Sequence, residues 1–206
     1  MRNMIVFPVA LLTTLLVAIT AAAAPPQSVT ISVSRPTVVF GKSVTLSGKT
    51  SDSKAGEKVD VLAEPFGGTS FTALTSVDTT AGGHWTDVVS PTIETAYQAK
   101  WKSAVSSTVT VKVRPMITLT LVDLAAGTFS TKVTAARSFG GKFVLVQRLI
   151  STGATTLKKV TLDSSSSATF HVRLHHGRSR LRVVMPTSQA APGYITGMSN
   201  VLTVRR

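Results

Sequence analysis

The chain has 206 residues, a formal net charge of +13 at pH 7 and no cysteine. The lack of cysteine excludes disulfides, thiol chemistry and lipid attachment through an amino-terminal cysteine. Secreted animal modules of this size usually carry disulfides, so an exported chain without them is typical of a bacterial protein whose core is held by packing alone.

Residues 1–24 have the three-part layout of a secretory signal peptide. One positive charge at Arg2 precedes an apolar run over residues 5–19, and four alanines follow at 21–24. The run is shorter than the roughly 20 apolar residues that a membrane-spanning helix needs. We therefore expect cleavage after Ala23 or Ala24, a secreted or cell-surface protein, and no transmembrane anchor in the mature chain.

The next part of the chain, residues 25–113, is predicted to consist of short half-buried strands. Apolar and polar residues alternate with period two over residues 28–34, 42–48, 57–63 and 107–113. The stretch VDTTAGGHWTDVV, residues 77–89, has the pattern of a strand, a small polar turn and a second strand. Asp78 suits the start of that turn, where a short acceptor can bond backbone two residues on.

The same features return 85 residues later, in residues 114–206. Alternating stretches cover residues 116–122, 128–135, 142–149, 156–163, 169–174, 180–185 and 200–206. The pairs that fall into register are Gly56 with Gly141, Val59 and Val61 with Val144 and Val146, Asp78 with Asp163, and Trp85 with Phe170. About seven short strands, twice over, predict an all-β protein of two tandem β-sandwiches.

The chain resembles the bacterial immunoglobulin-like repeat domains of exported and cell-surface proteins. The resemblance rests on SVTISVSRPTVVFGKSVTLSGKT, AGEKVDVLAE, DTTAGGHW and TAYQAKW in the first part, and on GGKFVLVQR, LDSSSSATFHVRL and SNVLTVR in the second. The second part departs from the pattern, because Ser164–Ser167 replace the turn glycines and GRSRLRV lacks the tyrosine of the sixth strand. The resemblance implies a non-catalytic spacer, adhesion or ligand-presenting module, and no particular ligand.

Charge distinguishes the two predicted sandwiches. Residues 25–113 hold eight Lys and Arg against seven acids, a difference of +1. Residues 114–206 hold thirteen Lys and Arg against Asp123 and Asp163 alone, a difference of +11. Such an asymmetry indicates an anionic partner. We expect that partner to be an anionic cell-wall polymer or polysaccharide, and we expect no specific nucleic-acid binding.

The most basic stretch is FHVRLHHGRSRLRVV, residues 170–184. Alternation places its apolar residues inward and its charges outward, so a solvated face accounts for them fully. The alternative is a patch for anionic polymer, whose candidate contacts are Arg173, His175, His176, Arg178, Arg180 and Arg182. In an immunoglobulin-like sandwich the fifth and sixth strands lie in opposite sheets, which would divide these charges between two faces.

The sequence holds no catalytic motif, and we expect neither an enzyme nor a cofactor. Residues four apart on a strand, such as His171 and His175, lie roughly 13 Å apart, too far to share a metal ion. The alternative from another class is a hydrolase or a carbohydrate-binding module on a sandwich scaffold. Most aromatic residues fall at inward positions, but Phe66 and Phe71 could be partly exposed, and Tyr194 lies in a long loop, where contact residues are often presented.

Overall fold

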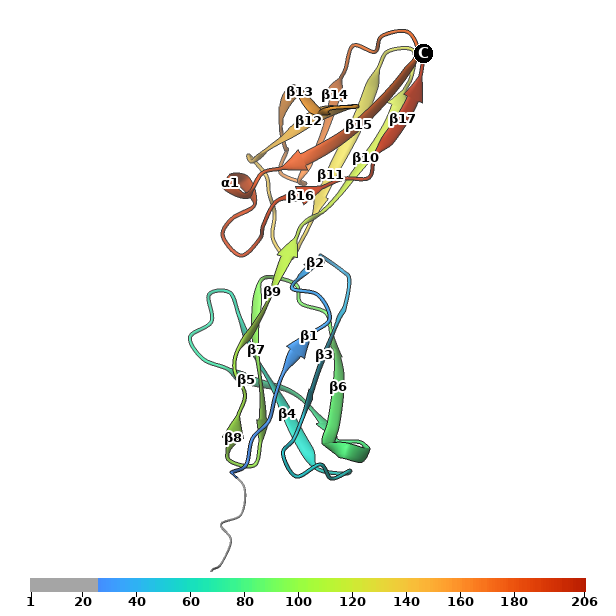
Figure 1. The fold of residues 1–206 in the computed structure, drawn as a ribbon. Coiled ribbons are helices and arrows are strands. Elements are labelled where there is room, and N and C mark those ends of the chain that lie inside the picture. The colour runs from blue at the N-terminus through green and yellow to red at the C-terminus, as the bar shows by residue number, and fades with distance from the viewer. Residues whose placement is uncertain (1–25) are drawn as a thin grey trace, which may run out of the picture.

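The structure, a computed structural model, describes residues 26–206, so the signal peptide predicted over residues 1–24 lies outside the described residues. The fold is all-β, as predicted, and its helical segments are a 3-10 turn at Ala81–Gly83 and the four-residue helix α1 (Thr187–Ala190). Figure 1 shows two β-rich halves lying end to end. We call residues 26–113 the first half and residues 114–206 the second half.

The first half is a sandwich of two sheets. The smaller sheet has the strand order β1-β3-β6, and the larger has the order β2-β9-β7-β4-β5, with β8 on β7. Neighbouring strands are antiparallel, except that β2 and β9 are parallel. The bounds are β1 (Ser32–Val33), β2 (Thr37–Val39), β3 (Val44–Lys49), β4 (Lys58–Pro65), β5 (Thr72–Asp78), β6 (His84–Val89), β7 (Thr95–Trp101), β8 (Ala104–Val105) and β9 (Val109–Arg114).

The second half repeats this arrangement. Its smaller sheet has the order β10-β11-β14, and its larger sheet has the order β13-β12-β15, with both β16 and β17 on β15. The bounds are β10 (Met116–Asp123), β11 (Thr128–Thr134), β12 (Phe143–Ile150), β13 (Gly153–Thr161), β14 (Ser167–His171), β15 (Arg178–Met185), β16 (Gly197–Met198) and β17 (Leu202–Arg205).

Each sandwich has an open side between two edge strands. In the first half β5 is the edge of one sheet and β6 the edge of the other, and in the second half β13 and β14 hold the same places. In a constant-type immunoglobulin sandwich the strand equivalent to β5 and β13 lies instead at the edge of the smaller sheet's counterpart, beside the strand equivalent to β6 and β14. Here β5 pairs with β4 and β13 pairs with β12, so the edges of the open side are set by this pairing.

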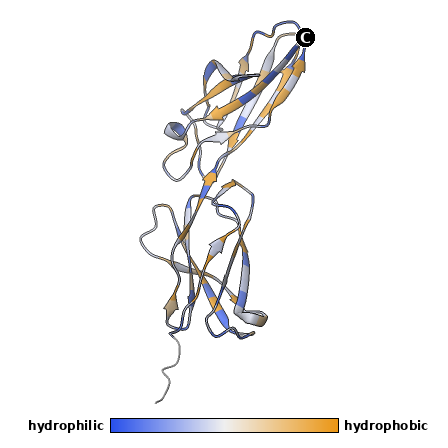
Figure 2. Cartoon of the chain, viewed as in Figure 1, coloured by the Kyte–Doolittle hydropathy of each residue, from blue (hydrophilic) through white to orange (hydrophobic). Residues whose placement is uncertain are grey.

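The core follows the predicted alternation. Val59, Val61, Val144 and Val146, which the 85-residue register aligns, are all 0% exposed. Trp85 and its counterpart Phe170 are also buried. Figure 2 shows hydrophobic residues concentrated along the strands of both halves. Since β-branched residues pack well on a pleated surface, these strands bury one face each without disulfides.

The hydrogen bonds predicted for Asp163 at its turn are confirmed, but those predicted for Asp78 are wrong, although a turn does connect β5 to β6. The Oδ1 atom of Asp163 accepts hydrogen bonds from the backbone N–H groups of Ser165 (2.8 Å) and Ser167 (2.9 Å). The Ser165 hydroxyl, followed by these N–H groups, lowers the pKa of Asp163. Asp78 instead pairs with Lys58 at the end of β5, and the 3-10 turn at Ala81–Gly83 makes the connection to β6.

Candidate anion-binding site

The basic stretch from residue 170 to residue 184 alternates between buried and exposed positions, as predicted. Its buried apolar side chains are Phe170, Val172, Leu174, Leu181, Val183 and Val184. Its exposed charged side chains are His171, Arg173, His175, His176, Arg178 and Arg180, whereas Arg182 is half-buried. Outward charge is therefore a property of this stretch as a whole.

The charges are divided between two sheets, as the immunoglobulin-like arrangement predicts. β14 pairs with β11 in the smaller sheet, while β15 pairs with β12 and β17 in the larger sheet. β14 ends at His171, and Arg173 and His175 come directly after it. The other sheet carries Arg178, Arg180 and Arg182 on β15. The six predicted contacts are therefore close in sequence but divided between two sheets, and they do not form one continuous patch.

The arginines of β15 lie on the face of the larger sheet. Arg178 is directly opposite Arg205 of β17, and like charges in that position repel each other. Arg182 is partly used by the protein itself, since its Nε donates to Oε1 of Gln147 at 2.9 Å. This face is strongly positive, but its three arginines line none of four grooves found within residues 26–206.

The other charges border a groove on the open side of the second half. The groove has a volume of about 260 Å³ and is lined by Arg148, Leu157, Lys158, His171, Val172, Arg173 and His175. Arg148 comes from β12 and Lys158 from β13, so residues of both sheets converge here. Five of the seven lining side chains can carry positive charge and none is acidic.

Arg148 links the two sheets across this groove. Its Nη2 donates to the backbone carbonyl of Arg173 at 3.3 Å. Its Nε is buried and has no hydrogen-bond partner within residues 26–206. A buried donor without a partner is costly, and such groups are uncommon in folded proteins. The guanidinium of Arg148 is therefore held in place with part of its donor capacity unused.

The first half has a groove in the equivalent place with a different character. That groove has a volume of about 390 Å³ and lies beside β5 and β6. Lining residues of the second groove have equivalents in the lining of the first. Arg148 corresponds to Ala63 by the 85-residue register, and the strand pairing makes Val172 equivalent to Val89 and Arg173 to Ser90. The groove on the open side is thus lined by one acid and no basic residue in the first sandwich, and by five basic residues and no acid in the second.

Ion pairing reinforces the difference between the halves. All three ion pairs found in residues 26–206 belong to the first half: Lys58 with Asp78, and Lys102 with both Asp52 and Glu57. The thirteen Lys and Arg residues of the second half have no carboxylate within ion-pair distance in the described structure.

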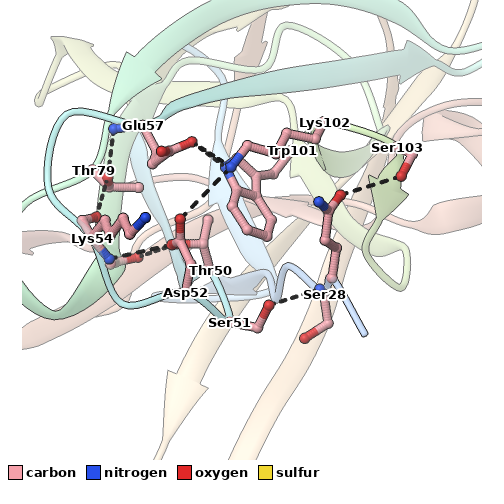
Figure 3. Close-up of polar contacts among 12 residues, drawn as sticks. Ser28, Thr50, Ser51, Asp52, Lys54, Glu57, Thr79, Trp101, Lys102 and Ser103 are labelled. Atoms are coloured by element: carbon pink, nitrogen blue, oxygen red, sulfur yellow. Dashed lines mark hydrogen bonds and ion pairs between the residues drawn. The ribbon is translucent and has the colours of Figure 1, made fainter. Parts of the chain in front are cut away.

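Figure 3 shows how the first half uses its acids. Lys102 Nζ lies 2.9 Å from Glu57 Oε2 and 3.8 Å from Asp52 Oδ2, and Trp101 Nε1 donates to Glu57 Oε2 at 3.1 Å. The hydrogen bonds from Lys102 and then Trp101 lower the pKa of Glu57. Burial opposes the shift at Asp52, but hydrogen bonds from Lys54 and Thr50 and the charge of Lys102 lower its pKa overall. The cluster ties the loop after β3 to the turn between β7 and β8.

No family model matches the sequence, and no curated protein matches it. The chain is similar to a solved tetra-tandem repeat from the extending region of a large adhesion protein, with 14% identity and a TM-score of 0.36 over 87% of this chain. It covers 49% of that structure, about half its length. It is also similar to native alpha-2-macroglobulin from Escherichia coli, spanning domains NIE to MG1, with 10% identity and a TM-score of 0.29, covering 86% of this chain and 98% of that one. At these identities the likeness concerns the fold alone.

The described part of the chain shows neither a metal-binding cluster nor a membrane-spanning helix. Residues 26–206 contain no group of three or more His, Asp or Glu side chains placed to hold a metal ion. The same residues include no helix of the length and apolar character that crossing a bilayer requires. Tyr97, which borders the groove of the first half, is a core residue, and burial raises its pKa to about 12.

The structure places Tyr194 differently from the exposed loop position expected for a contact residue. Tyr194 is 2% exposed. Its hydroxyl donates to the backbone carbonyl of Thr92, at 2.7 Å, and accepts from the N–H of Ala136 at 3.1 Å. Its ring packs edge-on against Phe139, with centroids 5.7 Å apart. Tyr194 therefore joins the two halves and is not available to a ligand, whereas Phe66 is exposed and Phe71 is half-buried.

Further contacts surround Tyr194 at the junction. The N–H of Glu94 donates to the carbonyl of Gly193, and the N–H of Ile195 donates to the carbonyl of Val113, both at 3.0 Å. The guanidinium of Arg114 donates to the carbonyl of Thr196. Figure 1 shows the loop between α1 and β16 lying against the end of the first half, beside the point where β9 runs into β10. These bonds hold the two sandwiches in one orientation.

Three of the five basic residues that line the groove were not among the predicted contacts: Arg148, Lys158 and His171. The signal for Arg148 was present, because it has the same parity as the inward-facing Val144 and Val146 and aligns with the buried Ala63. An arginine at an inward position calls for an explanation, since buried charges are normally paired. Lys158 carried no comparable signal in the sequence.

Proposed function

We propose that the protein is an exported, non-catalytic immunoglobulin-like module that binds anionic cell-envelope polymer through its second half. The observation that carries the proposal is the set of thirteen Lys and Arg residues in that half, none of which forms an ion pair within the described structure. A cluster of uncompensated cations attracts polyanions, because binding releases the small counterions of both partners.

The proposal includes a bacterial origin and a place outside the cell. The signal peptide expected over residues 1–24, the lack of cysteine and the resemblance to bacterial immunoglobulin-like repeats support this part. Secretion is tested by following the protein in the producing cells. Retention inside the cell, with residues 1–24 uncleaved, would contradict it.

A structural role accompanies binding in this proposal. The hydrogen bonds around Tyr194 and Gly193 fix the orientation of two sandwiches that are joined end to end. A fixed junction suits a spacer, which must hold a binding surface at a set distance from its point of attachment. The adhesive and the spacer roles thus rest on different parts of the same chain.

Binding to a phosphate- or sulfate-bearing matrix tests the proposal. The variant Arg173→Gln, Arg178→Gln, Arg180→Gln removes three exposed charges from the second half, and the control Lys42→Gln, Lys49→Gln, Lys54→Gln removes three exposed charges from the first. We expect elution of the first variant at clearly lower salt than the control, and a steep loss of wild-type binding as salt rises. Equal losses in the two variants would show that only net charge matters.

A further inference from the structure

We propose that the groove lined by Arg148, Lys158, His171, Arg173 and His175 binds the phosphate or sulfate groups of a linear polymer. This inference rests on the proposed affinity of the second half for anionic polymer and assigns that affinity to one place. The contacts are Arg148 of β12, Lys158 of β13, and three side chains on the segment from the end of β14 to His175.

Arg148 lies at a position that belongs to the core in the first half. The equivalent residue in the first half, Ala63, is 6% exposed and belongs to the core. Arg148 occupies this inward place without an acidic partner, and its Nε has no hydrogen-bond partner within residues 26–206. Arg148 as a whole is half-buried, but burying its Nε donor without a hydrogen-bond partner costs free energy. An anion drawn into the groove beside Arg148 would offset that cost.

No acidic side chain lines the groove to compete with an anionic ligand for its basic residues. Asp123 and Asp163 are the only acids in residues 114–206, and neither lines the groove. The positive charges of Arg148, Lys158 and Arg173 are therefore not cancelled locally. Field lines concentrate in a cleft of one sign with low-dielectric walls, so this groove attracts anions more strongly than a flat face of similar charge.

The spacing of the exposed basic side chains favours a long ligand with several charges. His171, Arg173 and His175 are exposed at intervals of two residues, which corresponds to roughly 7 Å per interval in an extended segment. A single small anion cannot contact all three, whereas a chain of regularly spaced anions can follow them. The apolar floor, formed by Leu157 and Val172, suits the uncharged parts of such a chain.

The types of basic side chain in the groove favour phosphate and sulfate as the anionic groups of the ligand. A guanidinium presents a planar fork of N–H donors that matches phosphate and sulfate oxygens in pairs. Two guanidinium groups, Arg148 and Arg173, border this groove together with one ammonium, Lys158. The face of β15 offers arginines as well, but Arg182 is engaged by Gln147, and the exposed Arg178 and Arg180 do not line this groove.

The test compares two variants of the mature chain with the same number of charges. Lys158→Gln with Arg173→Gln alters the groove, and Arg178→Gln with Arg180→Gln alters the face of β15. All four side chains are exposed and make no side-chain hydrogen bond within residues 26–206, so both variants are expected to fold, which circular dichroism melting checks. The probes are long-chain polyphosphate, dextran sulfate and polygalacturonate.

We expect the groove variant to lose more affinity for polyphosphate or dextran sulfate than the β15 variant. Its slope of log affinity against log salt should fall by about two, one for each lost contact. A third variant, Arg148→Lys, keeps the charge but removes the fork and should also weaken binding. The polymer that binds more tightly, polyphosphate or dextran sulfate, identifies the source of the anionic group.

The outcomes separate this inference from the proposed function. Equal losses in the groove and β15 variants would overturn the groove while leaving the affinity of the second half intact. Binding of polygalacturonate as tight as that of the other two polymers would overturn the phosphate or sulfate class. If the wild-type protein binds none of the three polymers at low salt, the proposed affinity itself is wrong, and the groove with it.

Discussion

The hydroxyl of Tyr194 donates a hydrogen bond to the backbone carbonyl of Thr92, 102 positions earlier in the chain and in the other half of the molecule. The same hydroxyl accepts a bond from the N–H of Ala136. In Tyr194→Phe both backbone groups lose this partner, and leaving buried polar groups unsatisfied costs about 1–3 kcal/mol. We expect a lower free energy of unfolding in urea titrations. Small-angle scattering should also show wider motion between the halves.

The matched control for that experiment is Tyr97→Phe. Tyr97 is equally buried, but it lies on β7, and its side chain makes no hydrogen bond to the second half within residues 26–206. Its substitution should leave the scattering profile unchanged. A change in both profiles, or in neither, would contradict the role of Tyr194 as a link between the halves.

Gly193→Ala should weaken the junction more than an ordinary glycine substitution. Gly193 has φ +78, and a Cβ atom there would lie 2.6 Å from Cδ1 of Ile93 in the first half. Gly177→Ala is the control, because Gly177 has φ +96 and no atom within 4 Å of the added carbon. Both changes carry the left-handed backbone cost, so the difference in unfolding free energy, about 1–3 kcal/mol, reports the crowding at the junction. Equal effects would show that Ile93 moves aside freely.

Residues 25–113 and 114–206, produced separately, should each give a soluble β-rich protein. Within residues 26–206 the strands pair inside one half, except that Arg114, the last residue of β9, pairs with Val39 of β2. Each half also buries its own row of valines. Both pieces should melt at lower temperature than the intact chain, because each loses the bonds around Tyr194. Circular dichroism checks this, and failure of both pieces to fold would show that the chain is one domain.

Lys102→Gln should lower thermal stability at pH 7 and have less effect in acid. The folded state lowers the pKa values of Glu57 and Asp52, so it favours their charged forms. That stabilisation is present above the ordinary carboxyl pKa of about 4 and is lost as pH falls through the lowered values. Melting temperatures from pH 7 to pH 2 should therefore converge for wild type and variant. Lys58→Gln removes a more exposed pair and should change the melting temperature less at every pH.

The sandwich could be predicted because its signal is local and repeated. Alternation of period two assigns Val59 and Val61 to the core without any knowledge of their neighbours, and the 85-residue register does the same for Val144 and Val146. Assigning the fifth and sixth strands to opposite sheets also needed only the general plan of such folds.

The candidate site was less accessible because its members meet only in three dimensions. The groove joins Lys158, on an edge strand, to Arg173, which follows an edge strand of the opposite sheet, and no sequence pattern states which edges face each other. The prediction of Tyr194 as an exposed contact residue was wrong for the same reason. Its loop has the composition of an exposed segment, and Tyr194 is buried by contacts with residues distant in sequence, such as Thr92 and Phe139.

The parallel pairing of β2 with β9 has a mechanical consequence. β2 lies near the start of the first half and β9 leads directly into the second, and they are joined by bonds such as Lys112 N to Pro36 O and Phe40 N to Arg114 O. Tension along the chain pulls these two strands in opposite directions, so the bonds between them are loaded in shear and must break together. Peeling would break them one at a time, at lower force. The small parallel ladder therefore acts as a clamp, which raises the barrier to unfolding whenever the protein is stretched between two attachments.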